Sequence, residues 1–232
     1  MIQVPGPLHE DGAVHVWKTT TASLHPEDLA VLDSAEREQA QRFRFQEDRD
    51  LYIHAHAALR RILSSYTAIP ACDLFFERGP YGKPELRSHS LRFNLSHSAG
   101  NIVIAVALQE VGVDIEFMRA DLDLLDIAQH FFSPRELALV AAAGAGITRT
   151  FYRIWTCKEA YMKATGMGFS LPSRSFDVCG DGQLGVLNSQ THPGWSLSEF
   201  PCAEGFAAAV VTQGVTSKVH VCDYAESCGR PL

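Results

Sequence analysis

The chain has 232 residues, of which 46% are hydrophobic and 20% are charged, which is enough apolar material for one or two soluble domains. Its formal net charge of −7 argues against nucleic acid as the main partner, so an anionic ligand would need a local cationic cluster or a metal. No apolar run approaches the roughly 18 residues of a membrane-spanning helix.

The N-terminal residues lack the basic and apolar regions of a secretory signal, and we therefore expect a cytoplasmic protein without a membrane partner. The six cysteines form no CxxC pair, and none has a histidine spaced for zinc. We interpret them as mostly buried, reduced thiols.

The first part of the chain is predicted to contain a strand at residues 14–17 and a long helical tract at residues 34–65. Apolar residues such as Leu51, Ala55 and Leu59 repeat at helical spacing, so this face is core. Charges of both signs nearly balance along the tract and mostly form a solvated face. Arg60 lies beside the apolar stripe, where its side chain could reach into a cleft.

A turn is predicted at residues 79–84, whose sequence GPYGKP places Lys83 near the tip. The sequence leaves two interpretations open, a plain hairpin turn and a loop that contacts an anion.

Residues 91–95 and 101–108 are predicted strands, and Ser96, His97 and Ser98 lie between them. A hydrolase would need His97 as the base for Ser96. Adjacent residues of an extended strand point to opposite faces, so this pair is poorly placed for that role. His97 fits a phosphate contact or a structural hydrogen bond.

The segment 111–116, VGVDIE, is predicted to be a strand with Asp114 and Glu116 on the same face. Two carboxylates one strand step apart repel each other unless a cation neutralises them. Carboxylate oxygens favour Mg²⁺, Mn²⁺ or Ca²⁺ over zinc. The alternative is an exposed strand end with two solvated acids.

A helix is predicted at residues 151–164, ended by Gly166 and preceded by a helix that Ser133 caps. Lys158 lies within its apolar arc, which costs free energy unless the lysine snorkels or meets an anion. Glu159 and Lys163 form an i,i+4 pair. The motif KEAxxK is either a solvated face with one salt pair or a metal ligand flanked by two phosphate-binding lysines. The rest of the chain alternates like antiparallel strands at residues 175–178, 183–187, 195–200, 206–211 and 218–222.

Together these segments resemble the Sfp-type 4′-phosphopantetheinyl transferases, over roughly residues 35–210. The resemblance rests on GKP at 82–84, FNLSHS at 93–98, GVDIE at 112–116, and Trp155 with KEA at 158–160 and Lys163. It implies an α+β pseudo-dimer of two similar halves, each a small antiparallel sheet with a long helix. The expected division is residues 1–109, with the nucleotide-end contacts, and 110–232, with the metal site and catalytic helix.

The resemblance also implies the reaction: a 4′-phosphopantetheinyl group moves from coenzyme A to a serine of an apo acyl or peptidyl carrier protein, releasing adenosine 3′,5′-bisphosphate. The implied Mg²⁺ ligands are Asp114, Glu116 and Glu159. The implied catalytic residues are Glu159 and Lys163, and the base that takes the serine proton is either Glu159, directly or through a metal-bound water, Lys163 or water. The implied coenzyme A contacts are Lys83, Pro84, Arg60, Ser96, His97, Lys158 and Lys163, with Arg60 at the 3′-phosphate.

One departure concerns the early helix, where some relatives carry lysines and this chain has Glu36 and Gln39. The resemblance further implies a monomer that docks its carrier through apolar contacts and a local basic patch. Three other classes remain open: a coenzyme A or carrier-binding protein without catalysis, a Ser-His hydrolase, and a metal-binding structural domain.

Overall fold

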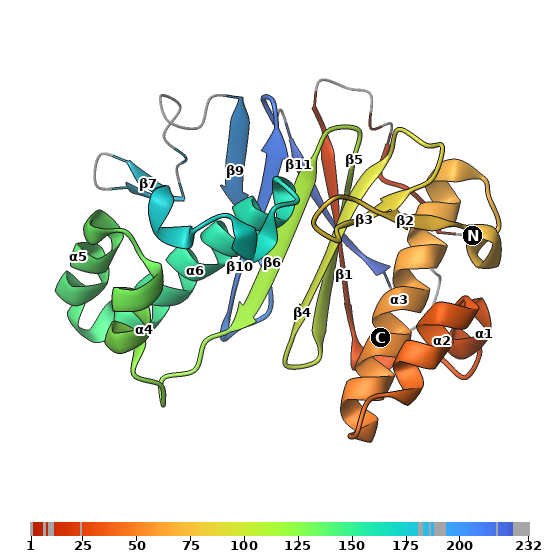
Figure 1. The fold of residues 1–232 in the computed structure, drawn as a ribbon, viewed down its shortest axis with the longest axis horizontal. Coiled ribbons are helices and arrows are strands. Elements are labelled where there is room, and N and C mark those ends of the chain that lie inside the picture. The colour runs from red at the N-terminus through yellow and green to blue at the C-terminus, as the bar shows by residue number, and fades with distance from the viewer. Residues whose placement is uncertain are drawn as a thin grey trace.

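The computed structural model describes residues 2–6, 8, 12–23, 25–180, 183–185, 187, 194–216 and 218–224. Its core is built from two sheets and two long helices (Figure 1). The first sheet has the order β11 (Val219–Asp223), β1 (Val14–Thr20), β5 (Asn101–Ala107) and β4 (Arg92–Ser98). The second has the order β6 (Val111–Phe117), β10 (Phe206–Gln213) and β9 (Trp195–Glu199).

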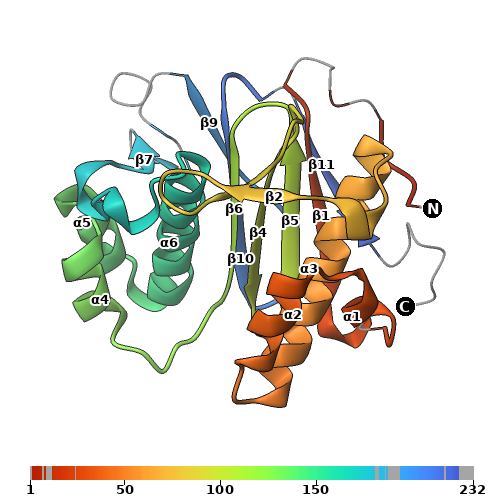
Figure 2. The same cartoon turned by 45° about the vertical axis from the view of Figure 1, so that its right-hand side comes forward.

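The long helices lie on the outer faces of the two sheets. Apolar residues of α3 (Gln46–Thr67) pack on β1, β4 and β5, and those of α6 (Ile147–Ala164) pack on β10. A third apolar cluster, which includes Val16, Val113 and Val210, joins the two sheets to each other. The result is a helix–sheet–sheet–helix arrangement (Figure 2), which confirms the predicted α+β fold of two halves.

One strand crosses from the second half to the first. Residues 219–223 form β11, which pairs in parallel with β1, whereas the other strand pairs of both sheets are antiparallel. The last described strand therefore completes the sheet that the first strand begins.

The predicted helix at 34–65 is corrected to two helices, α2 (Ser34–Gln41) and α3. A capping box between Asp33 and Glu36 starts α2, and the chain turns extended at Phe45 before α3 begins. The ring of Phe43 packs on Tyr52 at 5.3 Å between centroids, so an apolar side chain within the break has its own core contact. Helical spacing alone did not reveal this interruption.

The remaining elements are short. They are α1 (Asp28–Val31), β2 (Phe76–Arg78), β3 (Pro84–Leu86), α4 (Leu124–Phe131), α5 (Pro134–Ala142), β7 (Cys179–Gly180) and β8 (Gln183–Leu184). The predicted turn at 79–84 does connect a hairpin, β2–β3, and Ser133 does cap α5. The strand expected at 175–178 is absent, and of that expected at 183–187 only β8 forms within the described residues. In the part of the chain described, no helix combines the length and apolarity needed to cross a membrane.

Candidate active site

A glycine brings α6 unusually close to β6. A Cβ atom built on Gly112 would lie 2.1 Å from the carbonyl oxygen of Ala160 and 2.3 Å from the amide nitrogen of Ala164. No larger residue fits without moving the helix. Ala160 and Ala164 therefore lie directly against the strand that carries the sequence-predicted acids, and Glu159 and Lys163 each precede one of these contact residues.

Asp114 is the most buried acid of this region, with 2% of its surface exposed. Its Oδ1 accepts hydrogen bonds from Nζ of Lys163 at 2.5 Å and from Oγ of Ser96 at 2.8 Å. Its Oδ2 is buried and has no hydrogen-bond partner among the described residues. A buried carboxylate oxygen without a donor is costly, so this atom calls for a cation or a proton.

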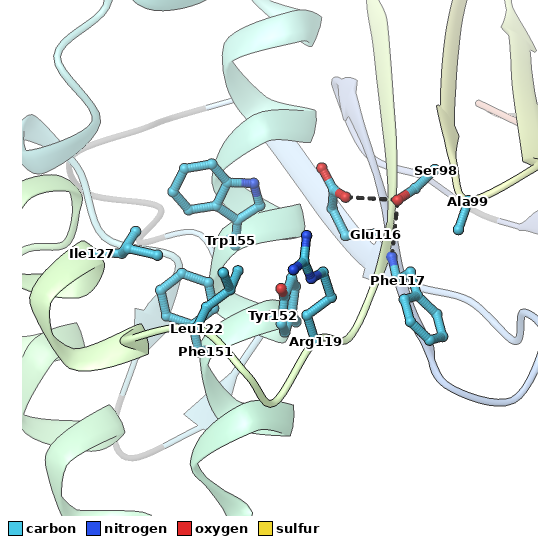
Figure 3. Close-up of a pocket in the computed structure, with 10 residues that line it drawn as sticks. All are labelled: Ser98, Ala99, Glu116, Phe117, Arg119, Leu122, Ile127, Phe151, Tyr152 and Trp155. Atoms are coloured by element: carbon cyan, nitrogen blue, oxygen red, sulfur yellow. Dashed lines mark hydrogen bonds between the residues drawn. The ribbon is translucent and has the colours of Figure 1, made fainter. Parts of the chain in front are cut away.

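Side chains of β4 connect the two halves across the sheet edges. The amide N–H of Val113 donates to Oδ1 of Asn94 at 2.9 Å. Ser98 donates to Oε2 of Glu116 at 2.9 Å and accepts from the amide N–H of Phe117 at 3.1 Å (Figure 3). Alternate residues of β4 thus take the place of a backbone ladder between β4 and β6. Sequence analysis missed the roles of Asn94 and Ser98, although a run of polar residues at period two was their signal.

The pKa values of all three acids are raised. Burial raises the pKa of Asp114, although the nearby Lys163 opposes this shift. Burial and then the charge of Asp114 raise the pKa of Glu116. The pKa of Glu159 rises to about 7, because of its burial and then the charges of Asp114 and Glu116. Burial and the neighbouring negative charges disfavour ionisation of the carboxyl groups, and when ionised the three groups create a strongly negative electrostatic potential.

These acids line a pocket of about 350 Å³ between the halves. Its lining comprises Leu95, Ser96, His97, Asp114, Glu116, Trp155, Glu159, Lys163 and Phe169. His97 is exposed at the edge of this pocket. Its pKa is lowered mainly by partial desolvation and, to a smaller extent, by its electrostatic interactions with Lys163 and His56. The structure therefore brings together six of the sequence-predicted site residues.

The three acids do not close into a tight ligand set. Within the described part of the chain, the group of acid and thiol ligand atoms that lie within 4.8 Å of one another is Glu136, Asp177 and Cys179. Both oxygens of Glu136 are already used, one by the amide of Val178 and the other by Lys158 and the amide of Ser133. Glu136 is part of the capping box that starts α5. Because its oxygens are already hydrogen-bonded, this group is a poor cation site.

The structure places Lys158 against Glu136, outside the lining of the carboxylate pocket. Its Nζ lies 2.7 Å from Oε2 of Glu136 and donates to the carbonyl oxygens of Ser173 and Phe176, at 2.7 and 2.6 Å. Burial lowers its pKa, and Glu136 opposes that shift. Glu136 of the chain itself therefore supplies the anion that Lys158 needs within the apolar arc of the helix.

Arg60 is likewise enclosed by partners from the chain, all of them in the first half. Its guanidinium is fully buried and donates to Glu36 at 2.6 Å, to Asp33 at 2.5 Å, and to the carbonyl oxygens of Ala71 and Leu74 at 3.0 Å. Four of its five N–H donors are engaged by these partners, and the side chain is fully buried among them.

Lys83 joins the two halves rather than offering a free ammonium to a nucleotide. Its Nζ donates to Oε2 of Glu110 at 2.9 Å and to the carbonyl oxygens of Val111 and Ala164 at 3.0 Å. The neighbouring Pro84 lines a separate pocket beside α2. The loop of the first half is thereby attached to the end of α6.

Comparison with known proteins identifies the class. Residues 110–211 match the family model of the 4′-phosphopantetheinyl transferase superfamily, and residues 15–109 match that of the 4′-phosphopantetheinyl transferase N-terminal region. The chain is 35% identical over 210 residues to the 4′-phosphopantetheinyl transferase HetI of Nostoc, covering 87% of this chain and 88% of that protein. It is 30% identical over 186 residues to the 4′-phosphopantetheinyl transferase Sfp of Bacillus subtilis, covering 78% and 82%.

The chain therefore belongs to the 4′-phosphopantetheinyl transferase superfamily. It is a transferase of this type, which confirms the resemblance seen in its sequence motifs.

Proposed function

We propose that the chain transfers the 4′-phosphopantetheinyl group of coenzyme A to a serine of an apo acyl or peptidyl carrier protein, with Mg²⁺ and as a cytoplasmic monomer. The observation that carries this proposal is Asp114, a buried carboxylate with one unpartnered oxygen, lying beside Lys163 in the same pocket as Glu116 and Glu159.

The donor set fits a magnesium ion better than zinc, because it consists of carboxylates. Asp114, Glu116 and Glu159 would hold the ion, since burial raises the pKa of each carboxyl and a cation would favour its charged form. When bound, the ion neutralises negative charge on a pyrophosphate. Some closure of the carboxylates would accompany binding, since they do not yet form a tight group.

Three neighbouring pockets provide room for the parts of coenzyme A. The pocket beside α2, of about 690 Å³, contains Arg42, His56 and Arg78 and suits the nucleotide end. Glu36, at a position where some relatives carry a lysine, is hydrogen-bonded to Arg60 and His56. Arg42 and Arg78 are therefore the better phosphate contacts in this pocket. The carboxylate pocket suits the pyrophosphate, with Lys163 and His97 as cations or donors.

The third pocket, of about 460 Å³, shares Glu116 and Trp155 with the carboxylate pocket and has an apolar wall that includes Phe151 and Ile127 (Figure 3). Its apolar lining suits the pantetheine arm. The three pockets would hold an extended ligand across the boundary of the two halves.

The chemistry is a displacement at phosphorus. The carrier serine oxygen forms a bond to the phosphorus that bears the pantetheine, and the bond from that phosphorus to the bridging oxygen breaks. Glu159 takes the serine proton as the ionised carboxylate, a form that a bound cation would favour by lowering its pKa from the metal-free value of about 7. Lys163, which forms an ion pair with Asp114, offsets charge on the transferred group. Adenosine 3′,5′-bisphosphate leaves.

The proposal is tested by intact-protein mass spectrometry of an apo carrier incubated with the chain, coenzyme A and Mg²⁺, with and without EDTA. A mass gain of one phosphopantetheinyl group that EDTA abolishes is expected. Coenzyme A binding without transfer to any of several carriers would instead favour a binding protein without catalysis. A hydrolase would lose all turnover in Ser96→Ala, whereas a transferase should suffer more from Asp114→Ala. Light scattering should give a mass near 25.5 kDa.

A further inference from the structure

Two histidines lie side by side on the parallel strand pair that closes the first sheet. His15 of β1 and His220 of β11 are direct partners in the strand register, so their side chains lie on the same face of the sheet. Their ring centroids are 5.3 Å apart and their ring planes are 80° apart. Because β11 is an edge strand and His220 is only partly buried, solvent reaches the pair from that side.

The ring of His15 has one polar atom without a partner. The residue is fully buried, and its Nδ1 lies 2.6 Å from the hydroxyl oxygen of Tyr66. That oxygen also accepts a hydrogen bond from Nε1 of Trp17 at 3.0 Å. Nε2 of His15 is buried and has no hydrogen-bond partner among the described residues. A buried polar atom without a partner costs free energy, so this nitrogen calls for a ligand or a weak contact that the chain supplies.

We propose that His15 and His220 form a binding site for a divalent transition metal that favours imidazole, such as Zn²⁺, and that the bound metal joins the last described strand to the first. Two imidazoles on one tetrahedral zinc hold their ring centroids about 5 Å apart, given Zn–N distances of about 2.0–2.1 Å. The observed separation of 5.3 Å matches this geometry. The partly exposed ring of His220 would turn about its side-chain bonds to direct one nitrogen toward the ion.

The surroundings of His15 suit a metal ligand. A metal-binding histidine usually donates its other ring N–H to an oxygen, and the hydroxyl of Tyr66 is placed to accept from Nδ1. Burial lowers the pKa of His15 to about 4, so the ring is neutral near pH 7, as a ligand must be. The part of the chain that the structure describes places no third acid, thiol or histidine in a tight group with this pair, so water would complete the coordination.

The site is separate from the proposed active site, because no residue that lines the carboxylate pocket comes from β1 or β11. The test is therefore hydrogen–deuterium exchange of the full chain with Zn²⁺ added in the presence of excess Mg²⁺, since it reports on each strand by itself. A metal that binds only the paired strands slows their opening by a factor of 1 + [metal]/Kd. At about ten times its Kd from calorimetry, Zn²⁺ should slow amide exchange in residues 219–223 about tenfold.

The variant to compare is His220→Gln, because replacing a partly exposed side chain leaves the fold intact, whereas His15 is fully buried. It should abolish the protection of β11 and weaken zinc binding at this site by at least about tenfold. His130→Gln is the matched control, since His130 is exposed on α4 and bonds only to a carbonyl of its own helix among the described residues.

Two results would overturn the proposal. One is equal zinc protection of β11 in the wild type and in His220→Gln. The other is no zinc protection of β11 in the wild type, which would mean that Nε2 of His15 keeps its proton and directs it at the ring of His220 as a weak hydrogen bond. Neither result depends on whether the chain modifies a carrier protein.

Discussion

Changing Glu159 to glutamine should stabilise the metal-free protein at pH 8. The pKa of Glu159 rises from its usual 4.5 to about 7 in the folded protein, because burial and the charges of Asp114 and Glu116 disfavour its ionised form. At 1.36 kcal/mol per pKa unit, this corresponds to roughly 3 kcal/mol. Glu159 is only half-buried, so water and salt screen the interaction and about 1–2 kcal/mol is expected.

The pH dependence follows from the sign of the shift. The raised pKa favours the folded state while Glu159 is protonated, so this contribution is fully present below pH 4.5 and is lost as the pH rises through 7. Glutamine cannot ionise. Stability of the metal-free wild-type protein should therefore fall between about pH 5 and pH 8 relative to the variant.

The assay is urea or thermal unfolding in EDTA at pH 5 and pH 8. At pH 8 the variant should melt roughly 2–8 °C higher, given the size of the chain. Adding Mg²⁺ should raise the melting temperature of the wild type more than that of the variant. Glu47→Gln, at an exposed position, is the control. If Glu159→Gln melts at or below the wild-type temperature at pH 8 without metal, the repulsion argument is refuted.

Three further predictions concern packing and the connection between the halves. Gly112→Ala should lower stability by more than about 2 kcal/mol, because its Cβ would meet the Ala160 carbonyl oxygen at 2.1 Å. Lys158→Met should cost about 3–5 kcal/mol in urea unfolding, since it leaves Glu136 buried without its cation. Ser98→Ala should weaken Mg²⁺ binding about tenfold in calorimetry, because the acid that it orients loses a donor.

A different result would contradict each of these predictions. A fully stable Gly112→Ala would show that α6 can move away from β6 at little cost. A stable Lys158→Met with weakened coenzyme A binding would return Lys158 to the role of a ligand contact. Threonine at position 98 should restore Mg²⁺ binding, and Ser175→Ala, which removes an exposed hydroxyl bonded only to Pro172, should leave it unchanged.

The sequence predicted the fold and the residue types of the site well because these depend on local periodicity. Period two on β6 places Val113 in the core between the sheets and turns Asp114 toward α6 and β4. The i,i+4 spacing of Glu159 and Lys163 likewise places both in one pocket.

The sequence could not predict which anion each buried cation would meet. The pattern shows that Lys158 needs a negative partner, but a ligand phosphate and a distant carboxylate satisfy that need equally. Glu136, 22 positions earlier, supplies it for Lys158, and Asp33 and Glu36 supply it for Arg60. Such partners are set by how helices pack, which is tertiary information that periodicity does not carry.

The return of β11 to the first sheet has a consequence for biosynthesis. While the ribosome is still making the second half, β1 has one edge without its neighbour, although β5 already covers the other. An open strand edge is a template for pairing with another chain. The first half therefore keeps an exposed strand edge until β11 has been synthesised, and a chain that stops after residue 211 should aggregate rather than fold into a shortened enzyme.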